Sequence, residues 1–159
     1  MSGKVVKSIC SIFMSLLIAL GYLIYVTAGN MPAVDSLKEW AVTILIFVAI
    51  AVGAYVVFHI LFMVVYTMVV TAKNDGKTDK EVEGIVSNSF CEDEMDKVIS
   101  RISGRAETIA VGIGFLAMLI ALACGAAAAI GLHIAVGAFF LGGVTQEIVS
   151  IILNVRGVK

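Results

Sequence analysis

Four long apolar stretches constrain this chain more than any other feature of its sequence. They cover about residues 8–28, 40–70, 107–130 and 132–154. Each contains the roughly 20 residues that an α-helix needs to cross about 30 Å of hydrocarbon. Hydrophobic residues make up 60% of the chain and charged residues 14%, whereas soluble domains carry about 25% charged residues. The sequence therefore predicts an all-α membrane protein, a single domain (1–159) with four transmembrane helices.

The basic residues predict the orientation, because short cytoplasmic loops are enriched in Lys and Arg. Ten of the 11 basic residues fall on the side of the N-terminus, the loop over residues 71–106 and the C-terminus, and Lys38 alone falls on the other side. We therefore expect a multi-pass protein of the cell membrane with both termini in the cytoplasm. Tyr22, Tyr25 and Trp40 are expected at the outer interface, where aromatic side chains gather.

The loop over residues 71–106 is the long polar segment of the sequence. Thr78–Glu81 and Ser89–Glu92 both match the S/T-x-x-E capping box that starts a helix. Apolar residues then recur at helical spacing, so we expect one continuous helix from Glu94 to Ala129, bending little at Gly104. Its first part is a short cytosolic helical extension of the third span.

Charged side chains of this extension are candidates for contact with a protein partner or with lipid headgroups. A solvated helix start and anchoring of basic residues at the headgroups are the structural alternatives. The candidates are Glu94, Asp96, Lys97, Arg101 and Arg105.

No enzyme, metal site or cofactor is predicted. The acidic run over residues 92–96 lacks the spacing and the glycine of an EF-hand loop, and the three cysteines have no metal-ligand spacing. GxSxG, HExxH and P-loop motifs are absent from the sequence. The net charge of -1 provides no basic field for nucleic acid. The lipid bilayer is the partner that the composition requires.

Motifs in about the last 70 residues resemble those of a known family. Glu92–Ile99 precedes the third span, Gln146–Val149 lies in the fourth, and Arg156 with Gly157 closes the chain. They resemble an uncharacterised prokaryotic family of small four-span membrane proteins, catalogued as a domain of unknown function. This sequence departs from the family pattern at Met95 and Gln146, where the family has an arginine and a small residue. The resemblance implies a four-span fold and a regulatory or accessory role beside helix-turn-helix regulators, and it implies no activity.

Glu147 is the polar residue of the spans that most needs an explanation. It lies nine residues before Arg156, so at about 1.5 Å per residue it is roughly 13 Å inside the cytoplasmic boundary. A carboxylate at that depth is a functional candidate by default. His59 is its predicted partner. The alternative hydrogen-bond donors are Thr145 and Gln146 beside it and Ser11 and Ser15 on the first span. The contact is either structural, fixing helix packing, or part of a proton-linked or ion-linked switch.

Small residues four apart in the third span, at Ala106, Ala110 and Gly114, predict close helix packing. Their neighbour is either the fourth span of the same chain or a second copy in a homo-oligomer.

Two functions remain open on the sequence alone. The first is a non-enzymatic regulatory or accessory protein that engages a membrane or cytosolic protein through its cytosolic helical loop. The alternative is a small ion- or proton-linked transporter or channel that uses the membrane-buried Glu147.

Overall fold

The structure, a computed structural model, describes residues 3–29, 32–33, 36–73 and 94–157. These residues form the helices α1 (Gly3–Thr27), α2 (Leu37–Lys73), α4 (Glu94–Ala123) and α5 (Ala128–Arg156). Each of the four is long and apolar enough to cross a membrane. The prediction of an all-helical chain with four such helices is confirmed. The predicted capping boxes at 78–81 and 89–92 lie outside the described residues.

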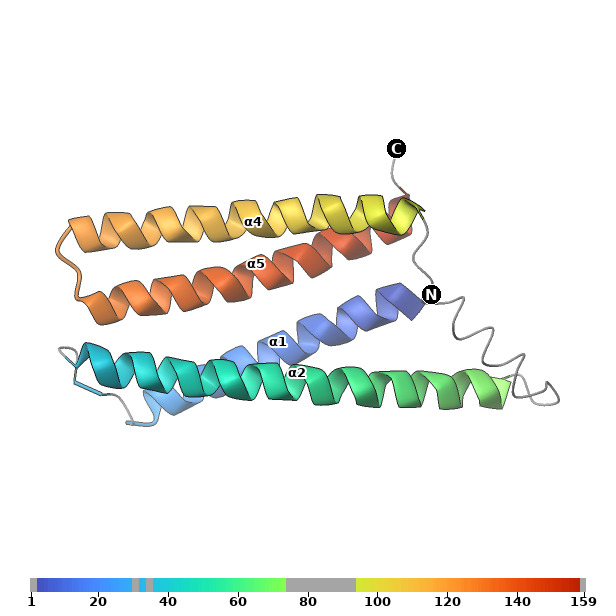
Figure 1. Ribbon diagram of the computed structural model, residues 1–159, viewed down its shortest axis with the longest axis horizontal. Coiled ribbons are helices and arrows are strands. Elements are labelled where there is room, and N and C mark those ends of the chain that lie inside the picture. The colour runs from blue at the N-terminus through green and yellow to red at the C-terminus, as the bar shows by residue number, and fades with distance from the viewer. Residues whose placement is uncertain (1–2, 30–31, 34–35, 74–93, 158–159) are drawn as a thin grey trace.

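The helices form a bundle in which α4 and α5 make a hairpin and α1 and α2 lie beside it (Figure 1). Helix α5 contacts each of the other three, whereas the backbone of α4 lies close to that of α5 alone among the described helices. Helices α1 and α4 begin, and α2 and α5 end, at one end of the bundle, which we call the termini end (Figure 1). We call the opposite end the turn end.

The turn between α4 and α5 comes earlier than the sequence predicted. Helix α4 is continuous through Gly104, as expected, but it ends at Ala123, so the predicted continuation to Ala129 is wrong. Helix α5 then begins at Ala128 rather than near residue 132. The predicted boundary of the two spans at residues 130–132 therefore lies inside α5.

A glycine cap explains where α4 ends. Gly125 has a left-handed backbone with φ of 87°. Its N–H donates to the carbonyl of Leu122 at 3.0 Å, and the N–H of Ala126 donates to the carbonyl of Ala121 at 3.0 Å. These two bonds form a Schellman cap, a conformation that glycine favours because it has no Cβ.

Small residues bring α4 and α5 close together. A Cβ built at Gly114 would lie 2.1 Å from the Cβ of Ala138, and one at Gly142 would lie 2.6 Å from a methyl group of Val111. Helices in lipid associate through such close packing, because hydrophobicity gives them no preference for each other over lipid. At these positions the small residues serve packing within the chain.

Apolar side chains cover most of the outer surface of the described helices. Helix α2 exposes large hydrophobic side chains along its length, including Leu45 and Val65. Among the described residues, three buried side chains are instead polar, the serines Ser8, Ser11 and Ser103. This distribution suits a lipid environment, since lipid accommodates apolar surface and polar groups turn toward the bundle interior.

Candidate functional site

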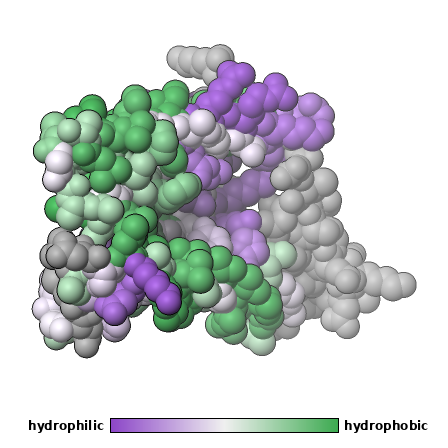
Figure 2. Space-filling model, turned by 60° about the vertical axis from the view of Figure 1, so that its left-hand side comes forward, coloured by the Kyte–Doolittle hydropathy of each residue, from purple (hydrophilic) through white to green (hydrophobic). Residues whose placement is uncertain are grey.

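A polar cleft of about 260 Å³ lies between α1, α4 and α5 at the termini end. Hydrophilic residues reach into a hollow of the molecule there, while much of the described surface around it is hydrophobic (Figure 2). The lining of this polar cleft is polar except for one isoleucine. Its residues are Lys4, Lys7, Ser8, Asp96, Ile99, Ser100, Ser103, Gln146, Glu147, Ser150 and Asn154.

Helical periodicity produces the polar cleft. On α1, polar residues recur every three or four positions on the face toward the cleft, while Ile9 and Phe13 are exposed on other faces. The same spacing occurs on α4 and α5. The three polar stripes are Lys4, Ser8 and Ser11 on α1; Asp96, Ser100 and Ser103 on α4; and Glu147, Ser150 and Asn154 on α5.

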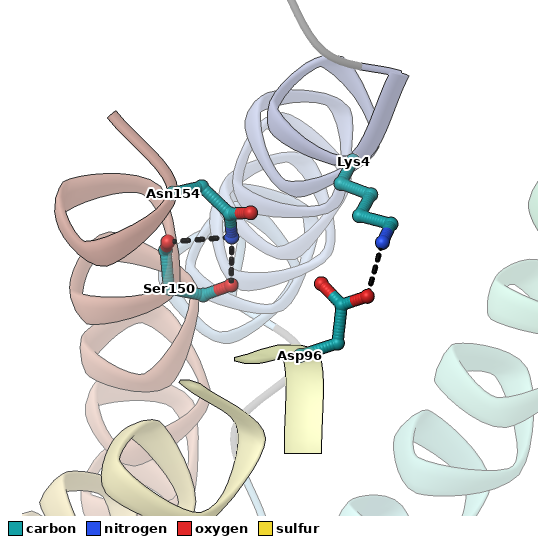
Figure 3. Close-up of polar contacts among 4 residues, drawn as sticks. All are labelled: Lys4, Asp96, Ser150 and Asn154. Atoms are coloured by element: carbon teal, nitrogen blue, oxygen red, sulfur yellow. Dashed lines mark hydrogen bonds and ion pairs between the residues drawn. The ribbon is translucent and has the colours of Figure 1, made fainter. Parts of the chain in front are cut away.

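An ion pair crosses the mouth of the polar cleft. The ammonium group of Lys4 on α1 donates to Oδ2 of Asp96, in the first turn of α4 (Figure 3). A negative charge is favourable in that turn because the helix dipole is positive at its N-terminus. On α5, Nδ2 of Asn154 donates to the carbonyl oxygen of Ser150 at 2.8 Å. The ion pair thus connects α1 to α4, whose backbones do not approach each other closely.

Glu147 and Gln146 both line the polar cleft, so the structure brings these two predicted candidates together. His59 is not part of it. His59 lies on α2, and no hydrogen bond or ion pair joins it to Glu147 within the described part of the chain. The predicted contact between Glu147 and His59 is wrong, because α5 turns Glu147 toward α1 and α4 rather than toward α2.

The way α4 and α5 align shows which residues lie at the same depth as Glu147. Glu147 lines the polar cleft together with Ser103 of α4, and Ser103 is two residues before the exposed Arg105. Arg156 lies beside the start of α4 instead, because the residue after it approaches Met95. Arg105, a candidate for anchoring at the headgroups, and Arg156, the marker of the cytoplasmic boundary, therefore lie at different depths. The predicted 13 Å is measured from Arg156, whereas Arg105 is close to the level of Glu147 itself.

Glu107 is an inward carboxylate that the sequence analysis missed. Its Cγ lies 3.4 Å from where a Cβ at Gly142 of α5 would be. Gly142 is five residues, or about 7 Å along α5, nearer the turn end than Glu147. A signal for it was available. Glu107 follows Asp96 by 11 residues, which is three helical turns, so both lie on the same face of α4.

The predicted cluster at the start of α4 divides between two faces. Asp96 faces the polar cleft, whereas Glu94, Lys97, Arg101 and Arg105 are exposed on the outside. Lys97 donates to Glu94 at 2.8 Å, one turn apart on the helix surface. No described helix covers this outer face, since α5 is the one described helix whose backbone lies close to that of α4.

A second polar group lies toward the turn end. The hydroxyl of Tyr22 lies 2.7 Å from Nδ1 of His133, and the ring of Trp40 meets the His133 ring edge-on at 4.5 Å. Trp40 is only 4% exposed. Trp40 was predicted at the outer interface; it lies near the start of α2 at the turn end, where its packing against His133 buries it. His133 is isolated in the sequence, so its neighbours could not be predicted.

The described residues contain no group of three His, Cys, Asp or Glu side chains placed to hold a metal ion. Comparisons with protein-family models, with curated proteins and with solved structures find no match.

Proposed function

We propose that this chain is a small, non-enzymatic, ion- or proton-linked transporter or channel in which Glu147 is the ionisable group. The ionisable lining of the polar cleft is the observation that supports this proposal most. The polar cleft holds Glu147, Asp96 and Lys7 inside a bundle whose outer surface is largely apolar. Ionisable side chains that face the interior of a membrane bundle characteristically belong to ion and proton pathways.

The arrangement of charges in the polar cleft fits a proton or a small cation. Lys4 and Asp96 pair at the mouth, so their charges compensate each other. Glu147 lies further in, beside Gln146 and near the hydroxyl groups of the cleft serines. Carboxylate, amide and hydroxyl oxygens are the ligands that hard cations prefer. Glu147 can therefore accept a proton or hold a cation that enters from the termini end.

Ion flux is the direct test of this function. The purified protein is placed in liposomes that contain a pH-sensitive dye, and a potassium diffusion potential drives proton entry. We expect proton entry several-fold faster than in protein-free liposomes, and parallel assays measure sodium and potassium. Flux at background for all three ions would contradict the proposal.

We propose further that the termini end faces the cytoplasm. In the sequence, 10 of the 11 basic residues belong to the N-terminal segment, the loop over residues 71–106 or the C-terminal segment, and short cytoplasmic segments are enriched in Lys and Arg. In a cysteine-free variant, Ala33→Cys places a thiol at the turn end and Lys97→Cys places one at the termini end. An impermeant maleimide should label Ala33→Cys in intact cells and Lys97→Cys only after permeabilisation. The opposite pattern would invert the topology.

A regulatory or accessory function is the second candidate, and the outer face of α4 favours it. The exposed residues Glu94, Lys97, Arg101 and Arg105 form a charged stripe that no described helix covers. Such a stripe suits a membrane or cytosolic protein partner, lipid headgroups or a second copy of the chain, and the family resemblance points to the same role. Under this function the liposomes pass nothing above background, while a photoreactive side chain at Arg101 captures a specific partner.

A further inference from the structure

Two cavities follow each other along the inward face of α1. The polar cleft extends to Ser8. An apolar cavity of about 460 Å³ lies between α1, α2 and α5, and its lining includes Ser15 and Tyr22. It opens on the outer surface of the bundle, where the lining side chains Val52 and Phe139 are exposed. Ser8 and Ser15 are seven residues apart, or about 10 Å along the helix. Ser11 lies between them on the same face of α1.

A hydrogen bond between α1 and α2 lies at this dividing level. The hydroxyl of Tyr55 on α2 donates to Oγ of Ser11 at 2.9 Å. Ser11 is 2% exposed, so water does not reach it from either cavity. A buried hydroxyl without a partner is unfavourable, which keeps these two groups together. The backbones of α1 and α2 approach each other closely at few places.

The lining of α5 changes character at the same level. Gln146 and Glu147 line the polar cleft, whereas Gly143 and Val136 line the apolar cavity. Aromatic side chains, including Phe47 and Phe140, occupy much of the apolar wall. Hydrophobic segments of this kind exclude water and can close an ion pathway.

We propose that the hydrogen bond from Tyr55 to Ser11 is the inner seal of the polar cleft. It separates a water-accessible cleft from an apolar cavity that opens toward lipid, and a proton or small ion must pass it to leave the polar cleft toward the turn end. Its part in permeation rests on the proposed transport function, whereas the seal itself is a property of the packing and can be measured without transport.

Thiol accessibility tests the seal. In a cysteine-free variant, Ser100→Cys reports on the polar cleft and Ser15→Cys reports on the apolar cavity. With a charged, water-soluble thiol reagent we expect Ser15→Cys to react at least ten-fold more slowly than Ser100→Cys. Adding Tyr55→Phe should raise the rate at Ser15→Cys several-fold, because the phenyl ring keeps its shape but loses the donor. Tyr66→Phe, the same change on the same helix near the termini end, should leave that rate unchanged.

The outcomes separate the seal from the transport function. If Ser15→Cys reacts as fast as Ser100→Cys, or if Tyr55→Phe leaves its rate unchanged, the seal is refuted. If Tyr55→Phe does not fold, Ser11→Ala removes the acceptor of the same bond and takes its place. Accessibility that changes as expected while the liposomes show no flux would retain the seal and reject transport. Flux that is present and equal in the parent and in Tyr55→Phe would reject the seal's role in permeation alone.

Discussion

Gly114→Ala should destabilise the protein, whereas Gly112→Ala on the same helix should not. A Cβ at Gly114 would lie 2.1 Å from the Cβ and 3.2 Å from the Cα of Ala138, so α4 and α5 must move apart. Overpacking of this kind costs about 1–3 kcal/mol. Gly112 has nothing within 4 Å of the same position, so there only the gain in helix propensity remains, up to about 1 kcal/mol. The two substitutions should therefore shift stability in opposite directions.

Thermal unfolding in one detergent measures both effects. Gly114→Ala should lower the Tm of the parent, and Gly112→Ala should leave it equal or higher. The double variant Gly114→Ala with Ala138→Gly restores the space and should recover part of the loss, because the two positions contact each other. Shifts of the same sign for both single variants would show that α4 and α5 do not meet at Ala138.

Glu147→Gln should leave the protein folded and abolish its ion or proton flux. The amide keeps the size and the hydrogen-bonding capacity of the carboxylate, but it carries no charge and does not titrate. We expect a loss of at least ten-fold in the liposome assay, with the elution profile and Tm of the parent retained. Glu147→Leu should lose flux as well and should also disturb assembly, since leucine offers the polar cleft no hydrogen bond.

Glu94→Gln is the matched control, because it makes the same chemical change on an exposed side chain at the outer face of α4. It should keep the flux of the parent. Parental flux in Glu147→Gln would reduce Glu147 to a structural contact, and such contacts contribute on average only about 0.6 kcal/mol in a membrane protein. If Glu147→Leu matched the parent in expression and Tm, Glu147 would not organise the bundle either.

Much of the polar cleft could be predicted one helix at a time. The spacing of Ser100 and Ser103, and of Glu147 and Ser150, places each pair on one face of its helix. Glu107, which does not line the polar cleft, follows the same rule on α4, but its position at the start of the third apolar stretch obscures this spacing. Spacing within one helix cannot show which other helix its polar face meets. For that reason the predicted contact between Glu147 and His59 was wrong.

The sequence by itself determined the four apolar helices, because about 20 consecutive apolar residues have no stable place except a helix that crosses the bilayer. Only the tertiary structure decided which helices are neighbours and where their polar faces converge. Apolar side chains pack as well against lipid as against each other, so hydrophobicity does not select a neighbour. The selection depends on shape, as where Gly114 admits Ala138, and that fit turns Glu147 toward α1 and α4 and away from His59.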